Sequence, residues 1–224
     1  MKLLTACVLL VSYPAFCYCG SSGTGGSRGS SGSVREAPSK EGKMKNATKI
    51  MEDKMKNAKK LLGSNSTLFL VRAKYPSNIL PGKQNESACW NSTLIKKINE
   101  SEFQHNISYF NVTVARSPVL IQQQGIWTVH KKTHYVVTLQ TRTGKEPRIR
   151  GDWNIMQAAK DCMVVGLNPR TRNAICFYWV TKRTSNSSHP KCDRAYKRKC
   201  QNSTYQEYYW LTRCNSSNMP RNLE

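Results

Sequence analysis

Apolar and polar residues alternate along the middle of the chain, from Thr67 to Val180, and clusters of Gly, Pro, Asn and Ser interrupt the alternation. A period of two is typical of strands that bury one face, because successive side chains point to opposite sides. Four runs show it most clearly: Phe69, Val71, Ala73 and Tyr75; Tyr135, Val137 and Leu139; Met163, Val165 and Leu167; Ile175, Phe177 and Trp179. Many short strands predict an antiparallel barrel or sandwich, and alternation alone does not separate the two.

Two helices are predicted on either side of this β-region. From Lys43 to Leu62, apolar residues recur every three or four positions among lysines, which predicts an amphipathic helix. Such a helix either lies on a membrane surface or packs on the domain. Near the C-terminus, His189-Pro190 begins a second helical segment, since proline is tolerated at the first helical position. That helix would carry three residues on one side: Cys192, Tyr196 and Cys200.

Residues 1–19 have the features of a secretory signal peptide, namely a lysine, an apolar run and small residues at the end. Cleavage after Cys17 is the alternative to cleavage after Cys19. Residues 20–42 are rich in Gly and Ser and predict a disordered linker. We expect a folded domain over 43–218 and a short tail over 219–224. No later stretch is apolar for long enough to cross a bilayer as a helix, so an exported, extracellular protein is predicted.

Cysteines and glycosylation motifs also predict export. Cleavage after Cys19 would leave six of the nine cysteines, an even number that favours three disulfides, and the absence of any CxxC motif argues against a metal site. Ten Asn-X-Ser/Thr motifs predict a glycoprotein: Asn46, Asn65, Asn85, Asn91, Asn99, Asn106, Asn111, Asn186, Asn202 and Asn215.

Glycans must face solvent, so the motifs orient two strands. An outward Asn91 sends inward the side chains of Trp90, Leu94 and Ile98. An outward Asn111 likewise sends inward those of Phe110, Val112 and Val114. Asn106 has the opposite parity to Asn111, so either the strand begins after Asn106 or one of these two sites is unused.

The order of residues in the last third of the chain resembles the C-terminal half of the tick salivary lipocalins, the histamine-binding protein family. The resemblance rests on the following residues: Cys162-Met163-Val164-Val165, Cys176-Phe177-Tyr178-Trp179-Val180, Pro190-Lys191-Cys192, Tyr196, Cys200, Tyr209 and Cys214. Upstream, LFLVRAKYPSN followed by Cys89 is similar to the first strand of that family and its next-strand cysteine. The match covers roughly residues 44 to 214.

This resemblance implies an eight-stranded antiparallel barrel of the lipocalin type, with a short N-terminal helix that covers one opening and a C-terminal helix. It also implies three disulfides: Cys89–Cys214, Cys162–Cys192 and Cys176–Cys200. Family members sequester small molecules without turnover, so the implied function is capture of a small host mediator, with no cofactor.

Aromatic residues are plentiful on the predicted inner faces of the strands: Phe69, Tyr75, Trp90, Phe110, Tyr135, Phe177 and Trp179. The resemblance implies that they line a ligand cavity, whereas in a small barrel they would fill a solid core. Amine-binding members carry Glu-Leu-Trp after the cysteine that Cys176 matches, but Phe177 stands here in place of the acid. Asp152 and Asp161 are therefore the remaining candidate counter-ions for histamine or another biogenic amine.

The formal net charge of +22 favours anionic partners instead. A leukotriene or fatty acid would fit an apolar tunnel with arginines at its mouth, and four are candidates: Arg72, Arg142, Arg148 and Arg150. On the outer surface the same charge favours a glycosaminoglycan, an acidic host protein or a lipid head group, or else serves solubility alone. For an exported protein we expect no nucleic acid partner.

Catalytic motifs are absent from the sequence, and no enzyme is expected. His130 and His134 share parity on one predicted strand and are interpreted as separate surface or lining residues. Arg150, Gly151 and Asp152 form an integrin-recognition tripeptide behind a predicted turn. The alternative to mediator capture is thus a cationic antagonist that binds an integrin, chemokine, complement component or glycosaminoglycan.

Overall fold

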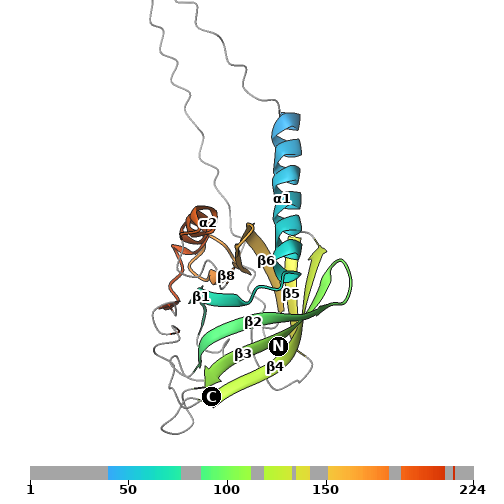
Figure 1. Ribbon diagram of the computed structural model, residues 1–224. Coiled ribbons are helices and arrows are strands. Elements are labelled where there is room, and N and C mark those ends of the chain that lie inside the picture. Colours follow the sequence, from blue (N-terminus) through green and yellow to red (C-terminus); the bar gives the residue numbers. More distant parts are fainter. Residues whose placement is uncertain are drawn as a thin grey trace, which may run out of the picture. The chain divides into compact units, whose positions relative to one another are not determined.

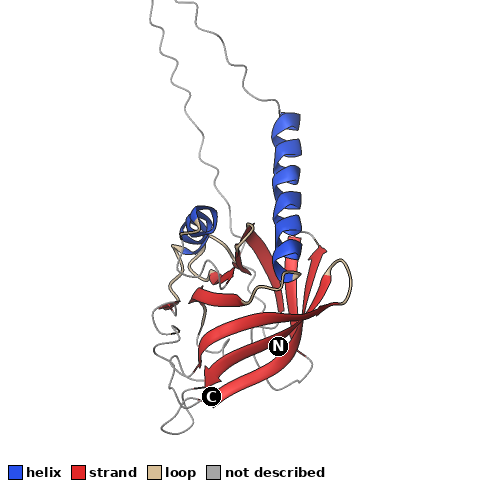
Figure 2. Cartoon of the chain, viewed as in Figure 1, coloured by secondary structure: helices blue, strands red, loops and turns tan. Residues whose placement is uncertain are grey.

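Eight antiparallel strands, β1 to β8, close into a barrel in the computed structural model of the protein (Figures 1 and 2). The structure describes residues 40–76, 87–111, 119–132, 135–141, 151–181, 188–209 and 214. The strands are β1 (Leu68–Lys74), β2 (Ser87–Lys97), β3 (Glu102–Asn111), β4 (Val119–Lys131), β5 (Tyr135–Thr141), β6 (Gly151–Ala158), β7 (Cys162–Leu167), β8 (Ile175–Thr181) and β9 (Glu207–Tyr209). The helices are α1 (Lys40–Leu62) and α2 (Pro190–Cys200).

The first strand closes the barrel. Each strand from β2 to β8 pairs with the next, and β1 then pairs with both β8 and β2. Its contact with β2 is short, with Leu68 opposite Ser92 and Phe69 opposite Asn91. This closure excludes the sandwich and confirms the predicted eight-stranded antiparallel barrel, with one helix before β1 and one after β8.

The ninth strand pairs with the part of β1 that β2 no longer contacts. Cys89 has a φ of 58°, and the pairing of β2 with β3 shifts register between Ala88 and Asn91. Beyond this point β9 pairs with β1, with Tyr208 opposite Ala73. The disulfide between Cys89 and Cys214 joins β2, which departs from β1 here, to the chain that follows β9, the strand that takes its place.

An irregularity in β1 changes which of its side chains face inward. The register against β8 shifts between Leu70 and Arg72, so one extra residue, Val71, is inserted. Leu70 lies opposite Trp179 and Ala73 opposite Phe177, and all four belong to the interior cluster. The prediction that Phe69 and Val71 share a face with Ala73 and Tyr75 was therefore wrong for the first two, because an inserted residue reverses the parity.

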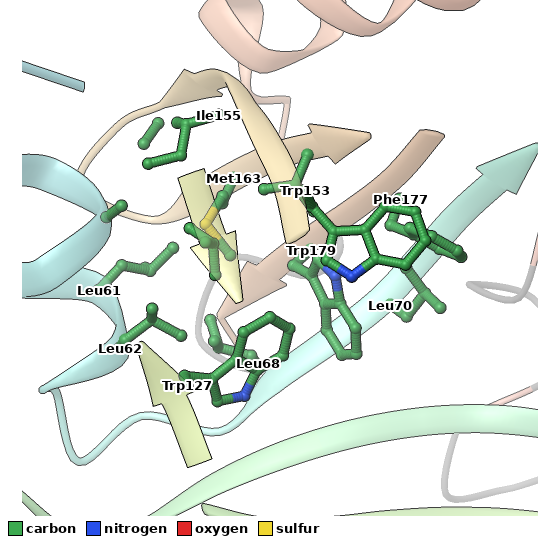
Figure 3. Close-up of a cluster of buried hydrophobic side chains, with 14 of the residues drawn as sticks. Leu61, Leu62, Leu68, Leu70, Trp127, Trp153, Ile155, Met163, Phe177 and Trp179 are labelled. Atoms are coloured by element: carbon green, nitrogen blue, oxygen red, sulfur yellow. The ribbon is translucent and has the colours of Figure 1, made fainter. Parts of the chain in front are cut away.

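Two hydrophobic clusters share β7 and β8. The interior cluster joins the end of α1 to the inner wall, as Figure 3 shows for Leu61, Leu62, Trp127 and Trp179. The second cluster lies between the outside of the sheet and α2 and includes Val164, Tyr178, Val180 and Tyr196. Because both faces of β8 are covered, all seven of its residues are buried.

The C-terminal helix begins at Pro190, as predicted, and buries four residues on one side: Cys192, Ala195, Tyr196 and Cys200. The Cys162–Cys192 disulfide joins α2 to β7, and the Cys176–Cys200 disulfide joins it to β8. All three bridges are those that the family resemblance implied.

The N-terminal helix packs through its final turns. Residues 45–50 are exposed, whereas Ala58, Leu61 and Leu62 are buried. The side chain of Asn57 donates to the carbonyl of Ala158 in β6 (3.3 Å). Packing on the domain is thus confirmed for the end of α1. Neither described helix is long and apolar enough to span a membrane.

Removing the Cys89–Cys214 disulfide should lower the free energy of unfolding more than removing either of the other bridges. The reason is chain entropy, because this bridge closes a loop of 125 residues. The entropic contribution of such a loop is about 5 kcal/mol, against about 3.5 kcal/mol for the 30- and 24-residue loops closed by the other two. We expect Cys89→Ala/Cys214→Ala to reduce the free energy of unfolding measured in urea and to expose the β1–β9 amides to hydrogen exchange. Cys162→Ala/Cys192→Ala is the control, since its exchange should rise in α2 instead. Unchanged protection of β9 in the first variant would contradict this role.

Candidate functional site

The inner wall of the barrel is aromatic. Five of the seven predicted lining residues belong to the interior cluster: Tyr75, Trp90, Tyr135, Phe177 and Trp179. The wall also contains aromatic residues that the alternation did not single out: Phe103, Tyr109, Trp127, Trp153 and Tyr208. They were missed because their own stretches of sequence are polar, and only pairing with a recognised strand reveals which side chains point inward.

Phe110 and Ile98 do not line the interior. Phe103, Ile107 and Tyr109 face inward along β3, so Phe110, although buried, has the outward parity of Asn106. The strand runs through Asn106, so the prediction from an outward Asn111 was wrong. In β2, Trp90 and Leu94 face the core as predicted, but a register shift between Leu94 and Lys96 leaves Ile98 42% exposed.

Many of the interior rings touch one another. The ring centroids of Trp90 and Tyr109 are 4.0 Å apart, and those of Tyr75 and Tyr208 are 4.7 Å apart. Trp153 meets Phe177 edge-on at 4.9 Å, and Trp127 meets Trp179 at 5.8 Å. These contacts join interior rings into small groups, which offer apolar contact and π-faces to a bound molecule.

A buried polar network ties α1 to this wall. The Nε2–H of His105 donates to the carbonyl of Leu62 (2.8 Å), which leaves Nδ1 to accept from the hydroxyl of Ser92 (2.9 Å). The indole N–H of Trp127 donates to the same hydroxyl oxygen (3.0 Å). The Leu62 carbonyl is at the end of a helix and has no partner within it, so His105 satisfies it. Both Ser92 and His105 are fully buried, and the network holds the helix in place rather than presenting a nucleophile.

Within the described part of the chain, the inner wall contains buried side-chain donors that have no partner. The indole nitrogen of Trp179 and the amide nitrogen of Gln123 are buried and form no hydrogen bond within the protein. Gln123 lies opposite Ile107, an interior residue, and so shares its inward parity. A buried donor without a partner costs roughly 1–3 kcal/mol, which an acceptor atom of a bound molecule would offset.

Neither predicted counter-ion lies inside the barrel. Asp152 precedes the inward Trp153 and is exposed, and its carboxylate accepts from Lys132 and from Thr138 (2.5 Å). The Lys132 ammonium holds the pKa of this carboxyl below its usual value. Asp161 lies at the β6–β7 turn, 3.3 Å from the Nδ1 of His189 beside α2. Both predictions were wrong, because strand parity and the turn place these acids on the outside.

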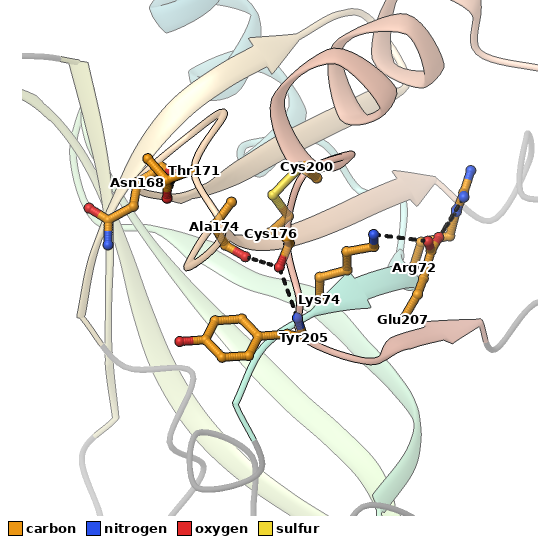
Figure 4. Close-up of a disulfide and its surroundings, with 10 residues drawn as sticks. Arg72, Lys74, Asn168, Thr171, Ala174, Cys176, Cys200, Tyr205 and Glu207 are labelled. Carbon is orange, nitrogen blue, oxygen red and sulfur yellow. Dashed lines mark hydrogen bonds and ion pairs between the residues drawn. A yellow bond between two sulfur atoms is a disulfide. The ribbon is translucent and has the colours of Figure 1, made fainter.

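Arg72 does not fit the prediction that arginines surround the opening of a ligand tunnel. Its guanidinium lies on the outer side of β1, where Nε and Nη2 donate to Glu207 (2.7 and 2.5 Å) and the group stacks over Tyr196 at 4.7 Å. Figure 4 shows this ion pair together with Lys74 beside the Cys176–Cys200 disulfide. The other three candidates, Arg142, Arg148 and Arg150, lie outside the described residues.

The integrin tripeptide does not form an exposed turn at its described residues. Gly151 and Asp152 begin β6 and pair with Leu139 and Thr138 of β5, while Arg150 lies outside the described residues. His130 has the outward parity next to Trp127 and Val129, and His134 lies outside the described part of the chain.

A cluster outside the barrel has the donor types of a metal site. Asp161, Cys162 and His189 place their ligand atoms within 4.8 Å of one another. Cys162 is bonded to Cys192, so its sulfur is not a thiolate that could bind a metal.

Four glycosylation motifs have an exposed asparagine: Asn46, Asn65, Asn99 and Asn202. Asn91, Asn106 and Asn111 are partly buried, and the oxygen of Asn91 accepts from Ser108 (2.6 Å). The remaining motifs, Asn85, Asn186 and Asn215, lie outside the described residues.

Comparison with solved structures returns matches of low sequence identity and low TM-score. Japanin of the tick Rhipicephalus appendiculatus, bound to cholesterol, aligns with a TM-score of 0.46 and 13% identity over 61% of this chain and 87% of its own. Lobster apocrustacyanin A1 aligns with a TM-score of 0.43 and 11% identity over 73% of this chain and 83% of its own. H1 crustacyanin of Homarus americanus aligns with a TM-score of 0.38 and 10% identity over 65% of this chain and 75% of its own. No protein-family model and no curated protein matches the sequence. The strand pairing of this chain, rather than these overlaps, establishes its fold.

His105 should make the protein less stable in acid. Desolvation lowers its pKa from 6.5 to about 4, so the folded state binds a proton more weakly than the unfolded state does. Stability is then fully present above pH 6.5 and is lost as the pH falls towards 4, by up to about 3 kcal/mol, with no further loss from this group below that pH. His105→Gln keeps a donor for the Leu62 carbonyl but does not titrate, so its unfolding free energy should be flatter over this range.

Urea unfolding at several pH values measures the effect. His130→Gln is the matched control and should retain the decline of the wild type. Parallel curves for His105→Gln and the wild type would show that another group causes the loss.

Proposed function

We propose that this protein captures one small, neutral, apolar molecule inside its barrel, and that the molecule offers an oxygen atom to the wall. The observation that carries the proposal is the pair of buried donors without partners, Trp179 Nε1 and Gln123 Nε2, in an otherwise aromatic wall. Placing polar groups sparsely in an apolar enclosure is how small-molecule sites fix the orientation of a ligand.

The charges of the site favour a neutral ligand over both ions that the sequence suggested. Among the described residues, none of those buried is Asp, Glu, Lys or Arg. A biogenic amine would then lose its hydration without gaining a carboxylate, and a carboxylate would gain no cation. Trp179 Nε1 and Gln123 Nε2 are donors, so they also match an ether, ester, ketone or hydroxyl oxygen better than an ammonium group.

The wider role follows from the family that the sequence resembles. Three disulfides, the predicted signal peptide and the glycosylation motifs support an extracellular protein. We propose that it acts as a salivary lipocalin that keeps a host mediator below the concentration its receptor needs, by stoichiometric binding and without turnover.

A matched series of ligands tests the ligand class. Methyl oleate, oleic acid and oleylamine share one tail and differ in head-group charge, and histamine tests the amine of the resembling family. Four of the five tryptophans belong to the interior cluster, so quenching or enhancement of intrinsic fluorescence reports binding. We expect methyl oleate to bind most tightly. Tighter binding of histamine or oleylamine would refute the neutral-ligand proposal.

Removing either donor should weaken the binding of methyl oleate. Trp179→Phe and Gln123→Leu each lose one hydrogen bond to the ligand, which corresponds to roughly two- to tenfold weaker binding. Gln123→Leu should also raise the stability of the ligand-free protein, because it removes an unsatisfied buried donor. Gln104→Leu on the outer face of β3 is the control and should leave affinity unchanged. Equal affinities for wild type, Trp179→Phe and Gln123→Leu would show that neither donor contacts the ligand.

A further inference from the structure

Positive charge gathers on the outer side of α2 and on the segments beside it. The basic ridge consists of six residues from three segments: Lys54 of α1, Arg170 of the β7–β8 turn, and Arg194, Lys197, Arg198 and Lys199 of α2. Arg170, Arg194, Lys197 and Arg198 are exposed, and the other two are half-buried. The ridge lies outside the barrel and is separate from the candidate ligand site.

The backbone holds these charges close together. The amide of Arg170 donates to the carbonyl of Lys199 (2.7 Å), and Arg170 has a φ of 69°, in the left-handed region. Two disulfides fix α2 to β7 and β8. Burial together with neighbouring cations lowers the pKa of Lys54, beside Arg198, and of Lys199, beside Arg170 and Lys54. The fold thus tolerates repulsion between like charges that are already in place before any ligand arrives.

Nearby acids do not neutralise the ridge, because they are engaged elsewhere. Asp193 accepts from the Tyr178 hydroxyl (2.8 Å) and from the amide of His189 (3.0 Å). Glu207 is paired with Arg72 and Lys74, as Figure 4 shows. Within the described part of the chain, none of the six ridge cations forms an ion pair.

A cleft of about 540 Å³ borders the ridge between α2, β1 and β9, and Arg194 and Lys197 line it together with Arg72 and Lys74. Asp193 and Glu207 also line this cleft, so the ridge continues into a concave surface that carries four cations and two engaged acids. Since α2 rises about 1.5 Å per residue, its four ridge cations, from Arg194 to Lys199, lie within roughly 8 Å of one another along the helix axis.

We propose that the basic ridge is a binding site for a sulfated glycosaminoglycan. A linear polymer with repeated sulfates matches a row of fixed cations, and guanidinium groups bind such oxyanions through two parallel hydrogen bonds. A lipid surface fits less well, because a membrane-binding face combines cations with exposed apolar side chains. Among the described residues, none of the exposed large hydrophobic residues lies on α2 or the β7–β8 turn, which carry five of the six ridge cations; they lie on α1, β2, the β2–β3 turn, β4 and β9: Ile50, Ile95, Ile98, Val119, Leu120 and Tyr209.

Heparin binding to the full chain tests this site. The ridge variant Arg170→Gln/Arg194→Gln/Lys197→Gln/Arg198→Gln removes four exposed charges. The control variant Lys49→Gln/Lys56→Gln/Lys60→Gln/Lys96→Gln removes four other exposed charges, so both proteins have the same net charge. In calorimetry at 0.15 M NaCl we expect the ridge variant to bind heparin on the order of tenfold more weakly, and the control variant about as tightly as wild type. Unchanged thermal unfolding and methyl oleate binding would show that the ridge variant is folded.

Binding of three further polyanions or anionic surfaces tests which chemical class of partner the ridge recognises. Hyaluronan, which has carboxylates but no sulfates, should bind much more weakly than heparin. Phosphatidylserine vesicles and duplex DNA should compete poorly with heparin. Equal losses of heparin affinity in the two variants would show that net charge alone attracts heparin. Vesicle or DNA binding that is tighter than heparin binding and is lost in the ridge variant would assign the ridge to that partner. Either result overturns the proposal without bearing on the barrel site.

Discussion

The pairing of β1 with two neighbours at once is the constraint on which the rest of the structure depends. At Leu68 and Phe69 the strand bonds to β2 on one side and β8 on the other, and this short contact turns an open sheet into a closed barrel. Closure removes exposed strand edges and creates an inside. The inward Ser92 lies opposite Leu68 at this point, so the network through Trp127, His105 and α1 starts from the closure itself.

The contact is short because the strands part soon after it. Cys89 adopts a left-handed conformation and β2 departs, and β9 takes its place along β1. A strand of three residues adds few hydrogen bonds of its own, so the disulfide to Cys214 and the Arg72–Glu207 ion pair hold it there. The same ion pair leaves Glu207 unable to neutralise α2. Stabilising the last strand and keeping the ridge cationic are thus two results of one interaction.

Inside and outside of the barrel differ sharply in charge. Among the described residues, the interior holds aromatic rings, the neutral His105 and the unsatisfied donors of Trp179 and Gln123, whereas ion pairs and cations lie on the outer surface. Desolvation explains the division, because a charge in the interior would need a partner that the aromatic wall does not contain. The proposed neutral ligand and the proposed polyanion therefore use physically separate parts of the same chain.

Local pattern was enough to predict β1, β5, β7, β8 and the helix that begins at Pro190, because alternation and helical spacing are properties of neighbouring residues. The choice of a barrel over a sandwich came from the family resemblance. The resemblance also implied the three disulfides. Alternation predicted inward side chains correctly wherever a strand is regular, as for Phe177 and Trp179 in β8.

The tertiary structure alone decided the details on which the candidate site depends. One extra residue at Val71 reversed the face of Phe69, a register shift in β2 exposed Ile98, and the pairing of β3 gave Phe110 the outward parity. The Ser92–His105 network and the inward Gln123 come from polar stretches whose orientation only their partner strands determine. Register is set by contacts between segments far apart in the chain, and a shift of one residue exchanges the two faces of a strand. The sequence by itself therefore determined which elements form, and only the closed barrel decided which side chains face its interior.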